Sequence, residues 1–148
     1  MKLNENGYKL ICEFEGLSLK PYLDSIKVPT IGYGNTYYLD GKRVSMLDEP
    51  INKAQAFEMF KEIADRFAKK VNSLIKVELT QNQFNSLVSF AYNVGTGNFQ
   101  SSTLLKKVNK DSNDTTIRLE FLKWNKAGGK IIAGLTSRRN KESKIYFT

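Results

Sequence analysis

EFEGLSLKPYLDSIKVPTIGYG, residues 13–34, is the stretch that carries both a fold signal and a chemical one. It places Glu15, Asp24 and Thr30 at intervals of nine and six residues. Its prolines and glycines, interleaved with Val, Ile, Thr and Tyr, predict short strands and turns. Two carboxylates and a hydroxyl brought to one cleft are what glycoside hydrolysis requires. The segment therefore predicts a small β region that holds a candidate hydrolytic site.

Helical patterns lie on both sides of this segment. Residues 4–13 predict a short helix with Asn4 as its N-cap. Asn52 and Gln55 form a capping box, and the apolar residues that follow at three- and four-residue steps predict a long helix that ends near Leu74. Its wide polar face is typical of a strut that joins two lobes.

A helical cluster is predicted after the long helix. Thr80 and Gln83 form a second capping box, and Gly95 ends the helix that they begin. Two further helices are expected at residues 101–109 and 115–126.

Three turn and cap signals complete this pattern of elements. Asp40-Gly41 resembles a two-residue hairpin turn. Gly128-Gly129 ends the helix predicted before it, and Thr136 is a candidate cap of the last helix.

The order of these elements predicts an α+β fold in one domain, residues 1–148. A small β-containing lobe is expected at about 13–51, a connecting helix at 52–75, and a larger helical lobe at 76–148 together with 1–12. A cleft is expected between the two lobes.

Composition removes several kinds of chemistry. Cys12 is the only cysteine and the chain has no histidine, which excludes an intrachain disulfide, Cys/His zinc sites and His-dependent triads. Cys12 lies among apolar residues and is expected to be a small core residue. Carboxylates remain as the main acid/base candidates, and no metal or cofactor is expected.

Charge and hydropathy limit the partners. The net charge of +8 suggests a polyanion: nucleic acid, an acidic membrane surface or an anionic wall polymer. No apolar run approaches ~18 residues, so we expect no stable membrane insertion. The start, MKLNENGYK, lacks the apolar core of a signal peptide, so synthesis in the cytoplasm and export by another route are expected.

Several motifs together resemble a known family. EFEG, YLDS, VPTIGYG, LTQNQFNSLVSFAYNVGTGNF, SSTLL and GLTSRRNKE, within residues 5–146, are similar in type and order to those of the phage-type lysozymes, the endolysins of glycoside hydrolase family 24. The resemblance implies a two-lobed lysozyme-like fold. It also implies a monomeric peptidoglycan muramidase that cuts between N-acetylmuramic acid and N-acetylglucosamine, acts on the cell wall, and needs a holin or similar lesion for release.

The resemblance also implies roles for the first three residues. Glu15 would be the general acid, and we expect desolvation beside Phe14 to raise its pKa. Asp24 would stabilise oxocarbenium character or activate a water, which Thr30 would hold. The family suggests inversion. Physical reasoning alone leaves retention and inversion open, because the choice depends on carboxyl separation.

Four further residues are predicted to bind substrate: Tyr33, Asn35, Phe99 and Arg138. Phe99 belongs to the predicted loop at 95–102 and could equally be core. Either one of Arg138 and Arg139 reaches the Glu15 region as an ion-pair partner, or both are solvated surface arginines. Asn35 stands where the family usually has histidine, and Ile26-Lys27 stand where the family often has glycine.

Two other functions remain open. A lytic transglycosylase would use one catalytic glutamate and form an anhydro-sugar without water, which the pair Asp24 and Thr30 argues against. A non-catalytic basic module would bind nucleic acid, but the 23 Lys and Arg are spread along the chain and no recognition motif occurs.

Overall fold

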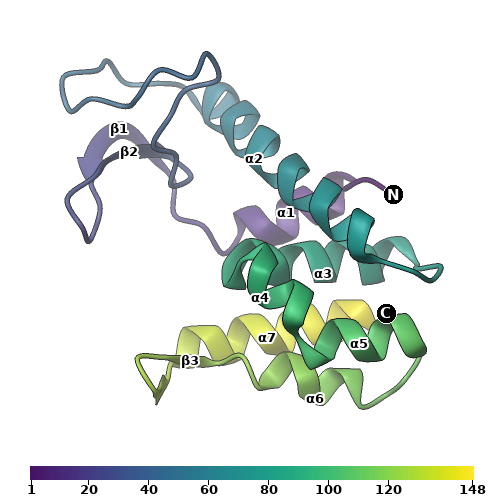
Figure 1. The fold of residues 1–148 in the computed structure, drawn as a ribbon. Coiled ribbons are helices and arrows are strands. Elements are labelled where there is room, and N and C mark those ends of the chain that lie inside the picture. The colour runs from purple at the N-terminus through teal and green to yellow at the C-terminus, as the bar shows by residue number, and fades with distance from the viewer. The chain divides into compact units, whose positions relative to one another are not determined.

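Helices make up most of the chain, and strands occur only in two short hairpins (Figure 1). The structure, a computed structural model, describes all residues from 1 to 148. The elements in chain order are α1 (Glu5–Cys12), β1 (Ser18–Leu23), β2 (Pro29–Gly32), α2 (Lys53–Leu74), α3 (Gln81–Val94), α4 (Thr96–Ser101), α5 (Thr103–Lys110), α6 (Ile117–Leu122), β3 (Lys126–Ala127), β4 (Lys130–Ile131) and α7 (Ala133–Tyr146). This order confirms the α+β class.

The chain divides into two compact units. Ile11–Arg66 form one, called here the hairpin unit. Met1–Leu10 and Phe67–Thr148 form the other, called here the helical unit. The division falls inside both α1 and α2, so each unit contains part of both helices.

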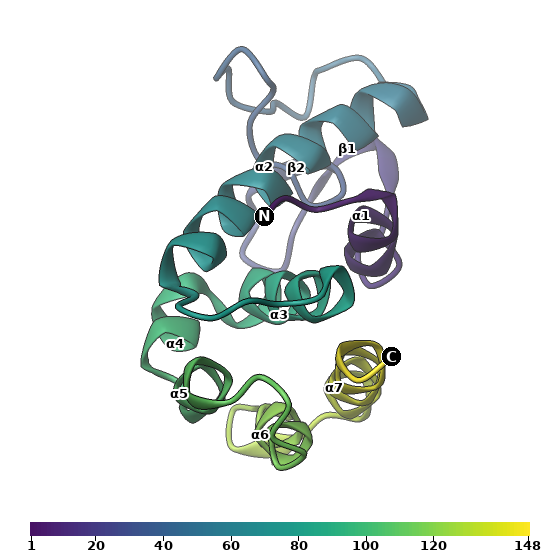
Figure 2. The same ribbon diagram turned by 90° about the vertical axis from the view of Figure 1, so that its right-hand side faces the viewer.

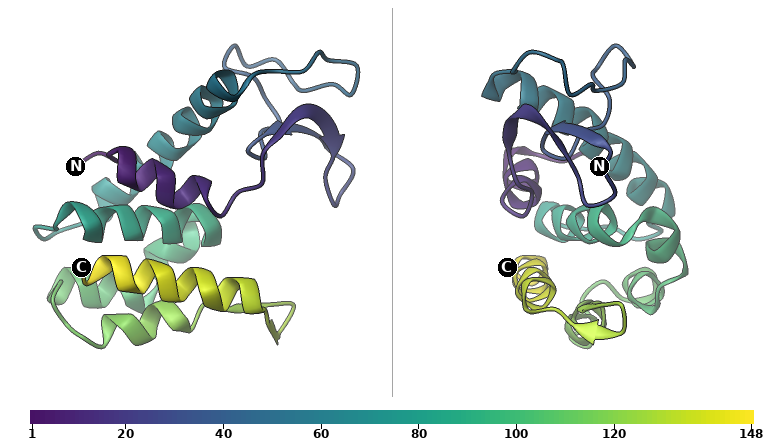
Figure 3. Two further views of the ribbon diagram at one scale, coloured as in Figure 1. Left: turned by 180° about the vertical axis from the view of Figure 1, so that it is seen from behind. Right: turned by 90° about the vertical axis from the view of Figure 1, so that its left-hand side faces the viewer.

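The hairpin unit is built on the antiparallel pair β1 and β2 (Figure 3). Tyr22 pairs with Thr30 and Leu23 with Pro29, and the register becomes irregular between Tyr22 and Ser18. A small buried cluster of Ile31, Val44 and Met59 lies in the same unit, with Tyr38 and Ile51 packed against it.

The start of α2 confirms the predicted capping box. Asn52 Oδ1 accepts from Gln55 N at 2.8 Å, and Gln55 Oε1 accepts from Asn52 N at 2.9 Å. Ala56, Phe60 and Ala64 follow at four-residue steps and are fully buried, which is the apolar stripe expected of an amphipathic helix.

The helical unit has its core around α3. The capping box of Thr80 and Gln83 is present as predicted, and residues Gln83 to Ala91 are all buried. In Figure 2, α5, α6 and α7 are seen nearly end-on, and α7 lies beside both α3 and α6. No helix of the structure has the length and apolar character needed to cross a bilayer.

Asn4 and Gly7 show why α1 begins as it does. Asn4 Oδ1 accepts from Gly7 N at 3.0 Å, which confirms the predicted N-cap, and also from Asn85 Nδ2 at 2.8 Å. A Cβ at Gly7 would lie 2.5 Å from Asn85 Oδ1. Glycine at this helical position therefore allows the close approach of α3.

Two predictions for residues 95–131 were wrong. The expected loop at 95–102 contains the helix α4, and the expected helix at 115–126 is limited to α6. The hairpin β3–β4 follows it, with Ala127 paired to Lys130. Gly128 and Gly129 have φ of 58° and 78°, as a two-residue type I′ turn requires. The glycines thus close a hairpin.

Two smaller predictions were also wrong. Ile132 occupies the N-cap position of α7, while Thr136 lies inside the helix and accepts from Asn125 Nδ2 at 3.2 Å. At Asp40, Tyr38 N donates to Lys42 O and Gly41 N donates to Tyr38 O. The connection therefore has three residues, the loop class next in frequency after the two-residue one.

Candidate active site

Asp24 lies in the turn that joins β1 to β2 and holds that turn together. Its Oδ1 accepts from Ile26 N and Val28 N, both at 2.9 Å, and its own N donates to Val28 O at 3.1 Å. Short acidic side chains favour turns because they make such bonds to the backbone two or more residues on. Its second oxygen, Oδ2, accepts no hydrogen bond from the protein. One carboxylate oxygen is structural and the other is free for chemistry.

Thr30 lies on β2 close to the same turn and is 3 % exposed. Its hydroxyl donates to Val28 O at 2.8 Å. Because the proton of the hydroxyl is used in that bond, its oxygen is left to act as an acceptor. Asp24 and Thr30 both bind the backbone of Val28, one through its N–H and the other through its carbonyl. The structure therefore brings together the two residues expected to manage a water.

Glu15 lies in the hairpin unit, three residues beyond the end of α1. Phe14 N donates to Ile11 O at 3.1 Å and Glu15 N donates to Cys12 O at 3.0 Å, so a tight turn extends the helix to this residue. Glu15 is half-buried. Its position at a helix–loop junction is the one predicted from sequence.

Cys12 does not act as a thiolate at neutral pH. Burial, and to a smaller extent the Glu15 carboxylate, raise the pKa of the Cys12 thiol to about 11. A protonated thiol is a poor nucleophile. The Cys12 thiol is therefore not an acid/base candidate near neutral pH, and the carboxylates stay the candidates of this unit.

Tyr22 is a candidate that sequence reasoning missed. It pairs with Thr30 across the hairpin, and directly paired residues place their side chains on the same face of a sheet. Asp24 is two residues further along, just past the end of β1. Tyr22 is 38 % exposed, and its hydroxyl has no partner in the protein. The period-two alternation counted back from Asp24 could have identified it.

Tyr33 and Asn35 take different positions in the hairpin unit. Tyr33 is half-buried, with its ring centroid 5.6 Å from that of Phe60, and burial raises its pKa. Asn35 is 3 % exposed, and its Nδ2 donates to Met59 O at 3.4 Å. Asn35 borders a pocket of about 260 Å³, but its side chain is almost wholly buried and offers little surface to a sugar, contrary to the prediction that it binds substrate.

Phe99 and Arg138 are buried in the helical unit. Phe99 has no exposed surface, and its ring lies 6.2 Å from Phe90. Arg138 is 5 % exposed, donates from Nη2 to Ser89 O at 2.9 Å, and lies 3.2 Å from Glu142 through Nε. Neither side chain presents a surface to a sugar, and the description of Arg138 as a solvated arginine is also wrong.

Glu142 is the centre of this buried network and was missed from sequence. It has no exposed surface, accepts from Ser89 Oγ at 2.5 Å, and its Oε1 lies 3.3 Å from Arg139 Nε. Burial raises the pKa of Glu142, and the two arginines oppose that shift. The spacing of RRNKE, which brings the arginines and the glutamate to one side of a helix, was the available signal.

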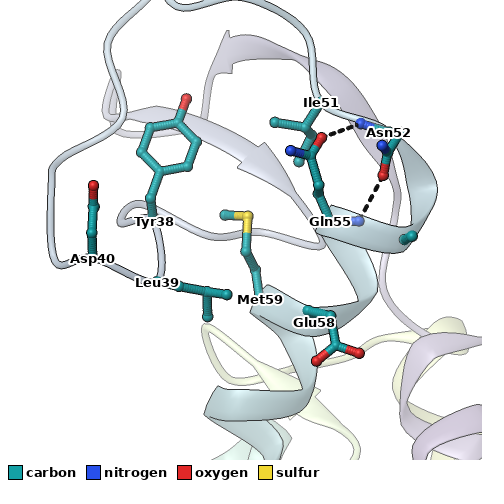
Figure 4. A pocket seen from close by; sticks show the side chains of 9 residues that line it. Tyr38, Leu39, Asp40, Ile51, Asn52, Gln55, Glu58 and Met59 are labelled. Carbon is teal, nitrogen blue, oxygen red and sulfur yellow. Dashed lines mark hydrogen bonds between the residues drawn. The ribbon is translucent and has the colours of Figure 1, made fainter.

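A pocket of about 570 Å³ lies elsewhere in the hairpin unit (Figure 4). Figure 4 shows Tyr38, Leu39 and Met59 around one space, while Asn52 and Gln55 are bonded to each other at the start of α2. None of Glu15, Asp24 and Thr30 lines this pocket. Nowhere in the chain do three or more His, Cys, Asp or Glu gather as metal ligands would.

The comparison with protein-family models decides the family. The model described as phage lysozyme matches residues 12–142. The chain belongs to the phage lysozyme family. Among its curated relatives, the endolysin of Bacillus phage PZA is 43% identical over 148 residues, which are 99% of this chain and 55% of that protein. This chain also matches 55% of the endolysin of Bacillus phage B103. The chain thus spans about half the length of the first curated relatives that it matches.

Solved structures of the phage lysozyme family have the same fold. An endolysin from Escherichia coli O157:H7 phage FAHEc1 is 39% identical with a TM-score of 0.87, over 99% of this chain and 93% of that one. A mutant lysozyme of phage P22 is 33% identical with a TM-score of 0.89, over 100% and 99%. These likenesses confirm the lysozyme-like fold expected from the motifs.

Proposed function

We propose that this chain is a muramidase, which hydrolyses the β-1,4 bond between N-acetylmuramic acid and N-acetylglucosamine in peptidoglycan. The observation that carries the proposal is the shared use of Val28 by Asp24 and Thr30. It holds a carboxylate and a hydroxyl acceptor at fixed positions on one hairpin. Membership of the phage lysozyme family supports the same conclusion.

Asp24 and Thr30 together suit the orientation of one water. A water has two protons to donate, and the site offers two acceptors, Asp24 Oδ2 and Thr30 Oγ1. When both protons are engaged, a lone pair of the water is directed away from them and towards the sugar. Asp24 then takes the proton as the water attacks the anomeric carbon.

Glu15 is proposed as the general acid that protonates the leaving oxygen. Attack by a water on the face of the sugar opposite the leaving group inverts the anomeric carbon, so the product is the α-anomer. Tyr33 and Tyr22 are the aromatic side chains of the same unit that we propose as sugar contacts. Asn35, Phe99 and Arg138 are buried and are not included.

The biological setting follows from the same proposal. The substrate is the glycan strand of the cell wall, and the enzyme works as a monomeric endolysin that lyses a host. Release through a lesion made by a holin or a similar protein belongs to this proposal. No cofactor takes part in it.

The test is a digest of purified peptidoglycan by the wild-type chain and by Glu15→Gln. The wild type should release fragments that end in reducing N-acetylmuramic acid, with the α-anomer formed first by NMR. Glu15→Gln should keep the wild-type Tm and lose at least about a hundredfold in rate, as the loss of a general acid implies. Reducing N-acetylglucosamine ends would contradict the assignment.

The same digest separates the transglycosylase alternative. That reaction consumes no water and leaves 1,6-anhydro ends, which mass spectrometry detects as fragments lighter by one water. The two proposed water acceptors, Asp24 Oδ2 and Thr30 Oγ1, would have no role in the transglycosylase reaction. Anhydro products would therefore replace the hydrolytic proposal.

A further inference from the structure

The net positive charge of the chain belongs to the helical unit alone. The hairpin unit contains seven Lys and Arg and nine Asp and Glu, a net charge of −2. The helical unit contains sixteen Lys and Arg and six Asp and Glu, a net charge of +10. The total of +8 therefore hides a strong asymmetry. The protein is therefore not uniformly basic over its surface.

Some of the basic residues of the helical unit are neutralised inside the fold. Lys107 and Lys123 both lie 2.9 Å from Glu120, and the buried arginines of α7 pair with Glu142. The exposed basic residues of this unit that form no ion pair are Lys2, Lys9, Lys69, Lys70, Lys76, Lys106, Lys110, Arg118, Lys126, Lys130 and Lys144. These free charges are what a partner in solution would meet.

The free charges are spread over the unit. They lie on α1, α2, α5, α6, α7, the hairpin β3–β4 and the connecting segments. In both Figure 1 and Figure 3 that hairpin projects past the ends of α6 and α7. A flat bilayer or a rigid duplex would reach one side of such a distribution. A flexible chain can follow it.

The type of side chain also limits the partner. Ten of the eleven free charges are lysines, which act as hydrated point charges without the bidentate geometry of arginine. Phe147 is the only aromatic among the large exposed apolar residues of this unit. Fully exposed stacking platforms of the kind that bind single-stranded nucleic acid are therefore scarce in this unit. A polyanion without bases fits better.

We propose that the helical unit binds a flexible polyol-phosphate chain, the phosphodiester polymer class carried by bacterial walls, through these dispersed lysines. The proposal rests on the proposed function, because that function brings the chain to the wall. The hairpin unit contains the candidate catalytic residues, and its small negative charge keeps it from competing for the polymer. The helical unit would hold the protein on the wall while the hairpin unit acts on glycan.

The test compares two variants that lose the same charge. The helical-unit variant carries Lys106→Gln, Lys110→Gln and Lys130→Gln. The hairpin-unit variant carries Lys20→Gln, Lys42→Gln and Lys53→Gln, which are also exposed and form no ion pair. Binding to purified poly(glycerol phosphate) is measured by calorimetry at several salt concentrations. No catalysis enters this measurement, so it stands or falls separately from the muramidase proposal.

The helical-unit variant should bind on the order of tenfold to hundredfold more weakly, and the slope of log Kd against log salt should fall by about 2. The hairpin-unit variant should bind within about twofold of the wild type. Equal losses in both variants would overturn the proposal, because net charge alone would then explain binding. Tighter binding to anionic lipid vesicles or to single-stranded DNA than to the polymer at equal phosphate would also overturn it.

Discussion

Replacing Asp24 by asparagine separates the two tasks of this side chain. The amide oxygen of asparagine can take the place of Oδ1 and accept from Ile26 N and Val28 N as the carboxylate does. The amide nitrogen then occupies the place of Oδ2. It is a donor and carries no negative charge, so it cannot take a proton from water. The turn is kept and the proposed base is removed.

The cost in stability can be worked from these two bonds. A hydrogen bond to a charged acceptor contributes about 1.5–3 kcal/mol and one to a neutral acceptor about 0.5–1.5 kcal/mol. One of the two bonds is exposed to solvent, which reduces the difference, so Asp24→Asn should lose about 1 kcal/mol. Asp24→Ala removes both bonds and should lose about 2 kcal/mol. For a chain of this length these losses correspond to Tm shifts of roughly 3 °C and 6 °C.

The cost in activity should be much larger than the cost in stability. Loss of a positioned general base lowers rates by about 10²–10⁴. Both variants are assayed for reducing ends released from purified peptidoglycan, well below their Tm. Asp24→Asn should therefore be nearly as inactive as Asp24→Ala while being closer to the wild type in Tm. Ser25→Ala, in the same turn and without hydrogen bonds, is the control and should change neither quantity.

One outcome would refute this reasoning. If Asp24→Asn keeps more than about a tenth of the wild-type kcat, Asp24 is a turn residue and another group acts on the water. Its bonds to Ile26 and Val28 would then be its whole purpose. Melting curves measured on the same samples exclude unfolding as the cause of any loss.

Three further substitutions test neighbouring parts of the hairpin. Thr30→Val should lower kcat on the order of a hundredfold because the water loses an acceptor. Thr30→Ser keeps the hydroxyl and should keep most of the wild-type kcat. Equal losses of kcat in the two variants would show that Thr30 acts through packing. Tyr22→Ala should lower kcat/KM about fivefold to tenfold, the scale of one aromatic contact, and Leu23→Ala on the other face should not; the same loss in both would remove Tyr22 from the site. Lys27 has a φ of 63°, so Lys27→Gly should raise the free energy of unfolding by about 0.5 kcal/mol. The control Lys20→Gly should lower the free energy of unfolding. A fall in Tm for Lys27→Gly would show that the turn is not strained.

Sequence patterns were sufficient to predict structure where the structure depends on residues that are close together in the chain. The pairs Asn52 with Gln55 and Thr80 with Gln83 each bond within three residues, so the starts of α2 and α3 could be predicted. The turn at Asp24 belongs to the same class. For this reason the spacing of the candidate catalytic residues along the chain is informative by itself.

Predictions failed where the outcome depends on distant partners. Gly128 and Gly129 end a helix or close a hairpin equally well in sequence terms, and only packing of the flanking residues decides. Phe99 looks like a sugar contact until Phe90 is placed against it. Arg138 was a surface candidate because nothing in its own segment reveals Ser89, which lies 49 residues earlier.

The turn between β1 and β2 explains how the candidate site can keep its spacing while its turn residues vary. In many turns a glycine supplies the left-handed conformation, but here Lys27 adopts it. The Asp24 carboxylate binds two N–H groups across the turn, at Ile26 and Val28, and so offsets a strain of about 1 kcal/mol. Val28 is then fixed, and its carbonyl orients the hydroxyl of Thr30. One residue added between Asp24 and Val28 would break the hydrogen bond from Val28 N to the Asp24 carboxylate and would misplace Thr30. A change in the identity of residue 27 would do neither. The six-residue interval from Asp24 to Thr30 is therefore a geometric requirement of this site, and the residues between them can change as long as their number and the N–H groups at positions 26 and 28 are kept.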